Sequence, residues 1–127
     1  MWIGRTVAVG APDDVTPVRD ALAFLRGRLE AGAGDDAQQL FPEGYYFAHA
    51  LYGLAWTDLA VAGHADASTA RREARWALEQ LESPAGRRPF RASLHPSYGI
   101  FYAGWTLLLR AQVAALDGEE DLSLIHI

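Results

Sequence analysis

The sequence contains no cysteine and no lysine, and each absence excludes a class of site. Without cysteine, the chain has neither disulfides nor thiolate metal sites. All 11 basic residues are arginines, against 16 acidic residues, and the net charge is −5. A nucleic-acid surface needs clustered positive charge, so this balance predicts no nucleic-acid partner. We interpret the short arginine clusters at 71–75 and 87–91 as a solvated helix face and a loop.

Long hydrophobic runs and catalytic signatures are also lacking. No run approaches the roughly 18 to 20 apolar residues that span a bilayer, so we expect no transmembrane segment. The first ten residues are too short and wrongly built for a secretory signal, which makes a cytoplasmic location the default expectation. We find no nucleophile elbow, phosphate-binding glycine loop, zinc-protease motif or dinucleotide fingerprint. No cofactor is therefore expected, and whether the chain is an enzyme stays open.

Half of the residues are apolar, in a chain of 127 residues that suits one domain. Apolar residues recur at helical spacing in four segments, 14–31, 42–62, 66–82 and 96–116. The first and third segments have a charged face, whereas the second and fourth are apolar on nearly all sides, as buried helices are. We predict an all-α fold of two antiparallel helix hairpins, in which outer amphipathic helices alternate with inner apolar ones.

The expected helical-hairpin domain covers residues 14–121 and follows an extension, 1–13, that is disordered or forms a short strand. The last six residues, 122–127, hold two of the four isoleucines of a chain whose composition is otherwise typical of GC-rich coding sequence. This hexapeptide resembles the translation of a transposase end sequence used in preparing sequencing libraries. The resemblance implies that 122–127 is a non-native tail, that the domain is incomplete, and that no function belongs to His126.

The alternation of helices also looks like an internal repeat. Pro42 and Pro96 are 54 residues apart, and the same offset relates Phe47 to Phe101. One hairpin cannot bury its apolar faces alone, whereas stacked hairpins can. Over residues 14–117 the pattern resembles the (α/α) toroids, the six-hairpin glycosidase-like and sugar 2-epimerase-like proteins. The resemblance is architectural and carries over no catalytic residue. It implies two hairpins of a larger ring, with a pocket at the N-terminal ends of the inner helices.

Each inner helix begins with a segment rich in polar and aromatic residues, at 40–49 and at 94–102. On the toroid resemblance these two entries line one cavity. Aromatic rings beside a carboxylate and imidazoles suit a carbohydrate-like small polar ligand. Glu43 is the candidate catalytic residue, because a half-buried carboxyl can act as a general acid or base. The candidate ligand-binding residues are Tyr45, Tyr46, His49, His95, Tyr98 and Tyr102.

Each candidate also has a purely structural interpretation. Glu43 fits an acidic residue that the helix dipole favours, and a glycosidase needs a second carboxylate, whereas Asp58 lies about four turns deeper. His49 fits a hydrogen-bonded core histidine. The tyrosines fit core residues whose hydroxyl groups need hydrogen-bond partners. Because no third ligand accompanies His49 and His95, no metal site is predicted. An enzyme fragment, a non-catalytic helical repeat that binds a ligand, and a structural scaffold therefore remain as alternatives.

Overall fold

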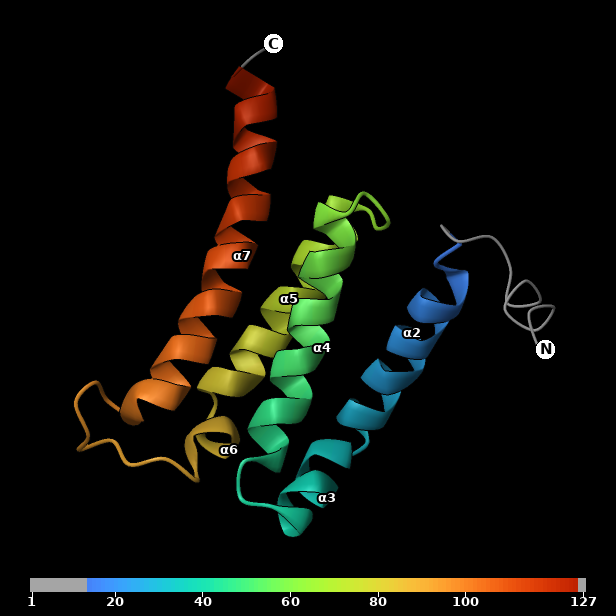
Figure 1. Cartoon of the computed structure of the whole chain (residues 1–127). Coiled ribbons are helices and arrows are strands. Elements are labelled where there is room, and N and C mark those ends of the chain that lie inside the picture. The colour runs from blue at the N-terminus through green and yellow to red at the C-terminus, as the bar shows by residue number, and fades with distance from the viewer. Residues whose placement is uncertain (1–13, 126–127) are drawn as a thin grey trace, which may run out of the picture.

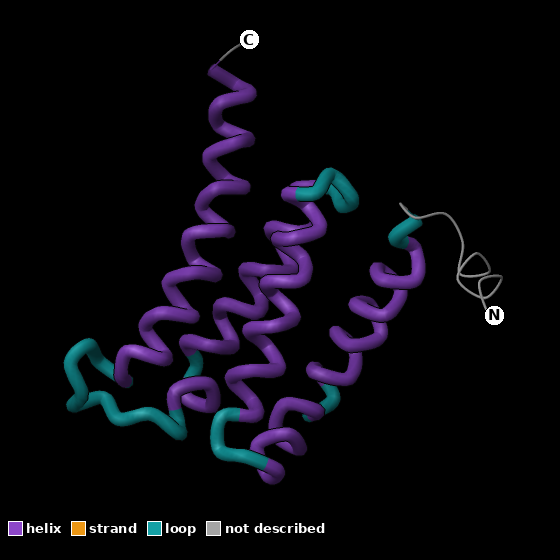
Figure 2. The backbone as a smooth tube through the Cα atoms, in the orientation of Figure 1, coloured by secondary structure: helices purple, strands orange, loops and turns teal. Residues whose placement is uncertain are grey.

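The computed structural model describes residues 14–125, and the side chains of residues 14–118. Within this range the chain forms six helices and no strand (Figures 1 and 2), which confirms the predicted all-α class. The expected extension, 1–13, and the last two residues of the expected tail, 126–127, lie outside the described residues. The helices are α2 (Thr16–Glu30), α3 (Ala33–Leu40), α4 (Gly44–Val61), α5 (Ala67–Glu82), α6 (Pro84–Arg87) and α7 (Gly99–Ile125).

The four long helices, α2, α4, α5 and α7, alternate in direction along the chain, so that sequence neighbours run antiparallel (Figure 1). Helix α4 is central, because it packs against α2, α3, α5, α6 and α7. Helix α5 packs against both α4 and α7. The Phe47 and Phe101 rings, from α4 and α7, lie 5.3 Å apart. The two apolar helices therefore touch each other, with α2 packed against α4 and with α5 packed against both of them.

Small residues allow α4 and α5 to approach closely. The predicted inward face of α5 is buried, with Ala70, Ala74, Ala77 and Leu81 fully inaccessible to solvent. Opposite them, Gly53 of α4 leaves room for its neighbours: a Cβ there would lie 2.9 Å from the Ala77 Cβ and from Leu109. The α4 side of this core is contributed by Tyr46, Ala50, Tyr52 and Trp56.

Two short helices, α3 and α6, stand where loops were expected. Gly32 does end α2, but its φ of 106° turns the chain directly into α3, where Asp35 and Asp36 occupy the favourable first turn. The Ser83–Pro84 pair does end α5, but the Ser83 hydroxyl also accepts a hydrogen bond from the Gly86 N–H at 3.2 Å and so caps α6. Gly32 and Ser83 therefore each end one helix and begin the next.

Helix α7 begins three residues later than the expected start at residue 96. Tyr98 has a φ of 67°, and this left-handed conformation keeps it out of a right-handed helix, so α7 begins only at Gly99, where φ is 91°. The helix also runs past the expected end at residue 116, as far as Ile125, so its backbone includes residues 122–125 of the expected tail.

One side of α7 is exposed, although the helix was expected to be buried all round. Its buried side consists of Tyr102, Thr106, Leu109, Val113 and Leu116. The other side forms an exposed apolar surface, here called the α7 stripe, with Ile100 81%, Leu107 62% and Leu108 42% exposed.

By length and composition alone, the Gly99–Gly118 part of α7 is apolar enough to cross a membrane, with a mean hydropathy of 1.2. A core helix of a globular domain can have the same composition, but such a helix is mostly buried, whereas 28% of this segment is buried. Two charged residues interrupt the segment, and both pair with α5: Arg110 with Glu82, and Asp117 with Arg75. These two ion pairs attach α7 to α5, against which it packs.

The burial of α5 makes a direct prediction about stability. Leu81→Ala should lower the free energy of unfolding by about 2–5 kcal/mol, because it leaves a cavity in a fully buried position. The same truncation at exposed Leu107 should change it by no more than about 0.5 kcal/mol. Urea denaturation followed by circular dichroism measures both values. Equal losses for the two variants would contradict this packing.

Candidate functional site

The start of α4 carries the candidate residues Glu43 and Tyr45. Glu43 is half-buried just before the helix, and its side chain makes no capping hydrogen bond. The Tyr45 ring lies 4.3 Å from the His49 ring, and its hydroxyl donates to Gln80 Oε1 at 3.0 Å. The Tyr45 side chain thus ties the start of α4 to the end of α5.

His49 and Tyr46 lie in the core. His49 is 1% exposed, and its Nδ1 donates to the Tyr45 carbonyl oxygen at 2.8 Å. Burial lowers the pKa of His49, which favours the neutral imidazole. Tyr46 is fully buried, and its hydroxyl donates to the Tyr102 carbonyl oxygen at 3.1 Å and lies 2.8 Å from the Thr106 hydroxyl. Burial raises the pKa of Tyr46 to about 12. Both side chains therefore contribute to packing between helices in this structure.

A cleft of about 410 Å³ lies at the start of α7. The guanidinium carbon of Arg87 lies 5.0 Å from the centre of the Tyr98 ring, within cation–π range. Arg87 Nε donates to the Tyr102 hydroxyl at 3.2 Å, and that hydroxyl donates to the Leu81 carbonyl oxygen at 3.1 Å. We call this space the α7 cleft, lined chiefly by Glu82, Arg87, Ser97, Tyr98, Tyr102 and Thr106.

The α7 cleft contains two of the six candidate ligand-binding residues, Tyr98 and Tyr102. Tyr45, Tyr46, His49 and Glu43 are not among the residues that line it, and His95 is exposed in the loop before it. Among the described clefts, then, none joins the two helix entries. Sequence reasoning missed Arg87 and Glu82 as lining residues. The arginine cluster at 87–91 was a usable signal, but we interpreted it as a solvated loop.

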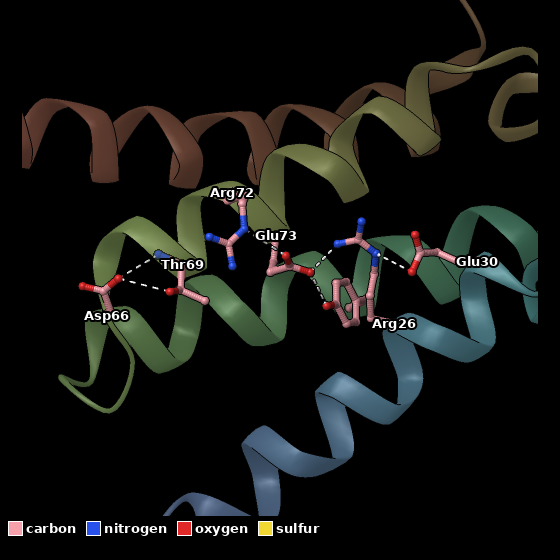
Figure 3. Close-up of polar contacts among 7 residues, drawn as sticks. Arg26, Glu30, Asp66, Thr69, Arg72 and Glu73 are labelled. Carbon is pink, nitrogen blue, oxygen red and sulfur yellow. Dashed lines mark hydrogen bonds and ion pairs between the residues drawn. The ribbon is translucent and has the colours of Figure 1, made fainter.

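A second group of polar residues connects three helices around the carboxylate of Glu73, on α5. This carboxylate accepts hydrogen bonds from the Tyr52 hydroxyl at 2.7 Å, from Arg26, and from Arg72 Nε at 3.3 Å (Figure 3). Arg26 comes from α2, and Tyr52 comes from α4. We call these four residues, Arg26, Tyr52, Arg72 and Glu73, the Glu73 cluster. Tyr52 and Glu73 are 21 residues apart on different helices, so helical periodicity alone does not predict their contact.

The Glu73 cluster shifts the pKa values of its members in opposite directions. Burial by itself raises the pKa of Glu73, but the hydrogen bonds from Tyr52 and Arg26 outweigh burial and hold this pKa below its usual value. Burial, followed by the hydrogen bond to Glu73, raises the pKa of Tyr52 to about 12. At neutral pH, the cluster therefore holds an ionised carboxylate between two guanidinium groups and a neutral phenol.

Neither a metal site nor a comparison with known proteins identifies a function. Within the part of the chain that the structure describes, no three His, Asp or Glu side chains are grouped so that they could hold a metal ion. Comparison of the chain with protein-family models, with curated proteins and with solved structures gives no match. The functional argument therefore depends on the geometry of the two polar sites.

The lowered pKa of Glu73 makes folding depend on pH in a definite direction. An acid with a lowered folded-state pKa stabilises the fold above its unfolded value, here 4.5, and that stabilisation is lost as the pH falls through the folded-state value. Glu73→Gln should therefore lower the free energy of unfolding at pH 7 by roughly 1–3 kcal/mol. The difference from the wild type should shrink below about pH 4.5.

Urea denaturation at pH 7, 5 and 3 measures this dependence. Glu79→Gln is the matched control, because Glu79 is an exposed residue of the same helix. A Glu73→Gln penalty that is equally large at pH 3 and pH 7 would show that the carboxylate charge plays no part.

Proposed function

We propose that the chain is a helical-hairpin module of the (α/α) toroid type that binds a carbohydrate-like small polar ligand in the α7 cleft. The observation that carries this proposal is the meeting of Tyr98 with Arg87 and Glu82 at the N-terminal end of an inner helix. In the toroids that the helix pattern resembles, the pocket opens at this end of the inner helices.

The chemistry of the α7 cleft suits such a ligand. An aromatic face packs against the apolar face of a sugar ring, while a few polar groups fix the hydroxyls. Tyr98 is partly exposed and offers the ring, with Tyr102 behind it at 5.3 Å between ring centres. Ser97 and Thr106 add hydroxyls, and Arg87 and Glu82 add a donor and an acceptor. The Gly99 N–H donates to the Pro96 carbonyl oxygen at 2.8 Å, but the next N–H groups of α7 lack acceptors within the helix and can donate to a ligand.

The same geometry favours binding over catalysis. Cleavage of a glycosidic bond requires two carboxyl groups on either side of it. Glu82 is the one carboxylate among the residues that line the α7 cleft, and it pairs with Arg110. Glu43 stands at the start of the other inner helix and is not a lining residue. Catalysis by Glu43 is therefore not part of this proposal.

A second candidate function is that of a helical repeat or scaffold module without a ligand. The α7 stripe favours it, because exposed apolar residues in a contiguous patch mark surfaces that another apolar surface covers. In helical repeats, the partner of such a face is the apolar face of a further helical hairpin. The two candidates make different demands on the chain, since one needs the α7 cleft and the other needs the α7 stripe.

The ligand proposal predicts that Tyr98→Ala weakens sugar binding roughly tenfold, the effect of a loss of about 1.4 kcal/mol. The measurement is saturation-transfer NMR with glucose as the probe. Phe24→Ala is the matched control, because Phe24 is an aromatic residue of α2 that is 70% exposed. Failure of glucose to bind, or equal binding by the Tyr98→Ala variant, would count against the α7 cleft as a sugar site.

The scaffold candidate predicts that the α7 stripe binds a hydrophobic dye and promotes self-association. Replacing Ile100 and Leu108, which do not line the α7 cleft, together by Ser should reduce the fluorescence of bound anilinonaphthalene sulfonate and shift the sedimentation profile towards monomer. Phe24→Ser should leave both readouts unchanged. A wild-type chain that stays monomeric and binds no dye would rule out this role for the stripe.

A further inference from the structure

The structure holds a second cleft, of about 260 Å³, beside the Glu73 cluster and between α2, α4 and α5. It is lined by the four cluster residues together with Trp56 and Thr69. We propose that this cleft binds a small organic carboxylate, independently of the α7 cleft. Two observations carry the proposal, an indole N–H without an acceptor and an exposed guanidinium group beside it in the lining.

The first observation is the unpaired indole of Trp56. Trp56 is 7% exposed, and its Nε1 is buried and has no hydrogen-bond partner. The indole faces Tyr52 closely enough to lower the pKa of that phenol slightly, but the two groups are not in hydrogen-bonding geometry. A buried donor without an acceptor is unfavourable, so an acceptor oxygen that reaches this N–H is favoured. A carboxylate supplies such an oxygen.

The second observation is the charge around the cleft. Arg26 and Arg72 line it with one carboxylate, Glu73, and both pair with it. Arg26 also pairs with Glu30 at 3.4 Å, so Arg72 is the guanidinium that a ligand can reach. Arg72 is 68% exposed at its side chain, and its terminal nitrogens point away from Glu73 (Figure 3). Its guanidinium is therefore accessible to a ligand. Guanidinium groups and carboxylates match in geometry as well as in charge.

An adjoining groove of about 500 Å³ continues the cleft along α5. It shares Arg26, Arg72 and Glu73 with the cleft and adds Arg71, Arg75 and Glu79, and the two added arginines pair with Asp117. In the proposed complex, one carboxylate oxygen accepts from Trp56 Nε1 and the other faces Arg72. The rest of the molecule extends towards the groove.

The test is a titration followed by the indole N–H signals in ¹H–¹⁵N NMR spectra, with the Trp56 signal identified by its loss in Trp56→Phe. Sodium glucuronate is the probe, and glucose, which has the same ring without the carboxylate, is the matched control. We expect glucuronate to shift the Trp56 signal saturably and glucose to leave it in place. Arg72→Gln should weaken the glucuronate affinity roughly tenfold, whereas Arg28→Gln, which removes an exposed charge elsewhere on α2, should not.

Several results would overturn the proposal. They are equal shifts with glucose and glucuronate, no saturable shift with glucuronate, and equal effects of Arg72→Gln and Arg28→Gln. Should Trp56→Phe fail to fold, triple-resonance assignment of the wild type identifies the signal, and Arg72→Gln tests the site through an exposed residue. Tyr98→Ala should leave the Trp56 shift intact, so failure of the α7 cleft and failure of this site are distinguishable.

Discussion

The constraint on which the rest of the structure depends is the apolar character of α4. Between Gly44 and Val61 this helix has one charged residue, Asp58, so it has no face suited to long contact with water. The fold covers most of α4 with α2, α3, α5, α6 and α7, although Leu51 and Val61 of this helix remain 59% and 80% exposed. Tyr46, His49, Tyr52 and Thr57 remain polar in part, and in each case a neighbouring backbone or side chain provides the hydrogen bond.

The burial of α4 explains why both proposed sites lie beside it. Aromatic and imidazole groups at its start are committed to packing, as His49 and Tyr46 are. Groups that can meet a ligand come instead from the neighbouring helices and their ends. Glu82 stands at the end of α5 and Arg87 on α6, whereas Arg26 stands on α2 and Arg72 on α5. Trp56 is the exception, because it belongs to α4 and yet lacks a hydrogen-bond partner.

Hydrophobic periodicity predicted the four long helices and the buried alanine face of α5, because both follow from a repeat within one segment. It missed α3 and α6, where Gly32 and Ser83 each end one helix and begin another. The candidate site was harder to predict, since contacts such as Glu73 with Arg26 join residues 47 positions apart. Periodicity shows which face of a helix a residue occupies, but not which residue of another helix lies opposite it.

Hydrogen exchange of the backbone amides, followed by NMR, tests the central position of α4 most directly. If α4 is the helix around which the others pack, its amides from Tyr46 to Thr57 should exchange most slowly, through global unfolding. The amides of α2, which is exposed along most of its length, should exchange faster through local opening. Exchange in α4 as fast as in α2 would contradict this account, because it would show that α4 opens without the rest of the fold.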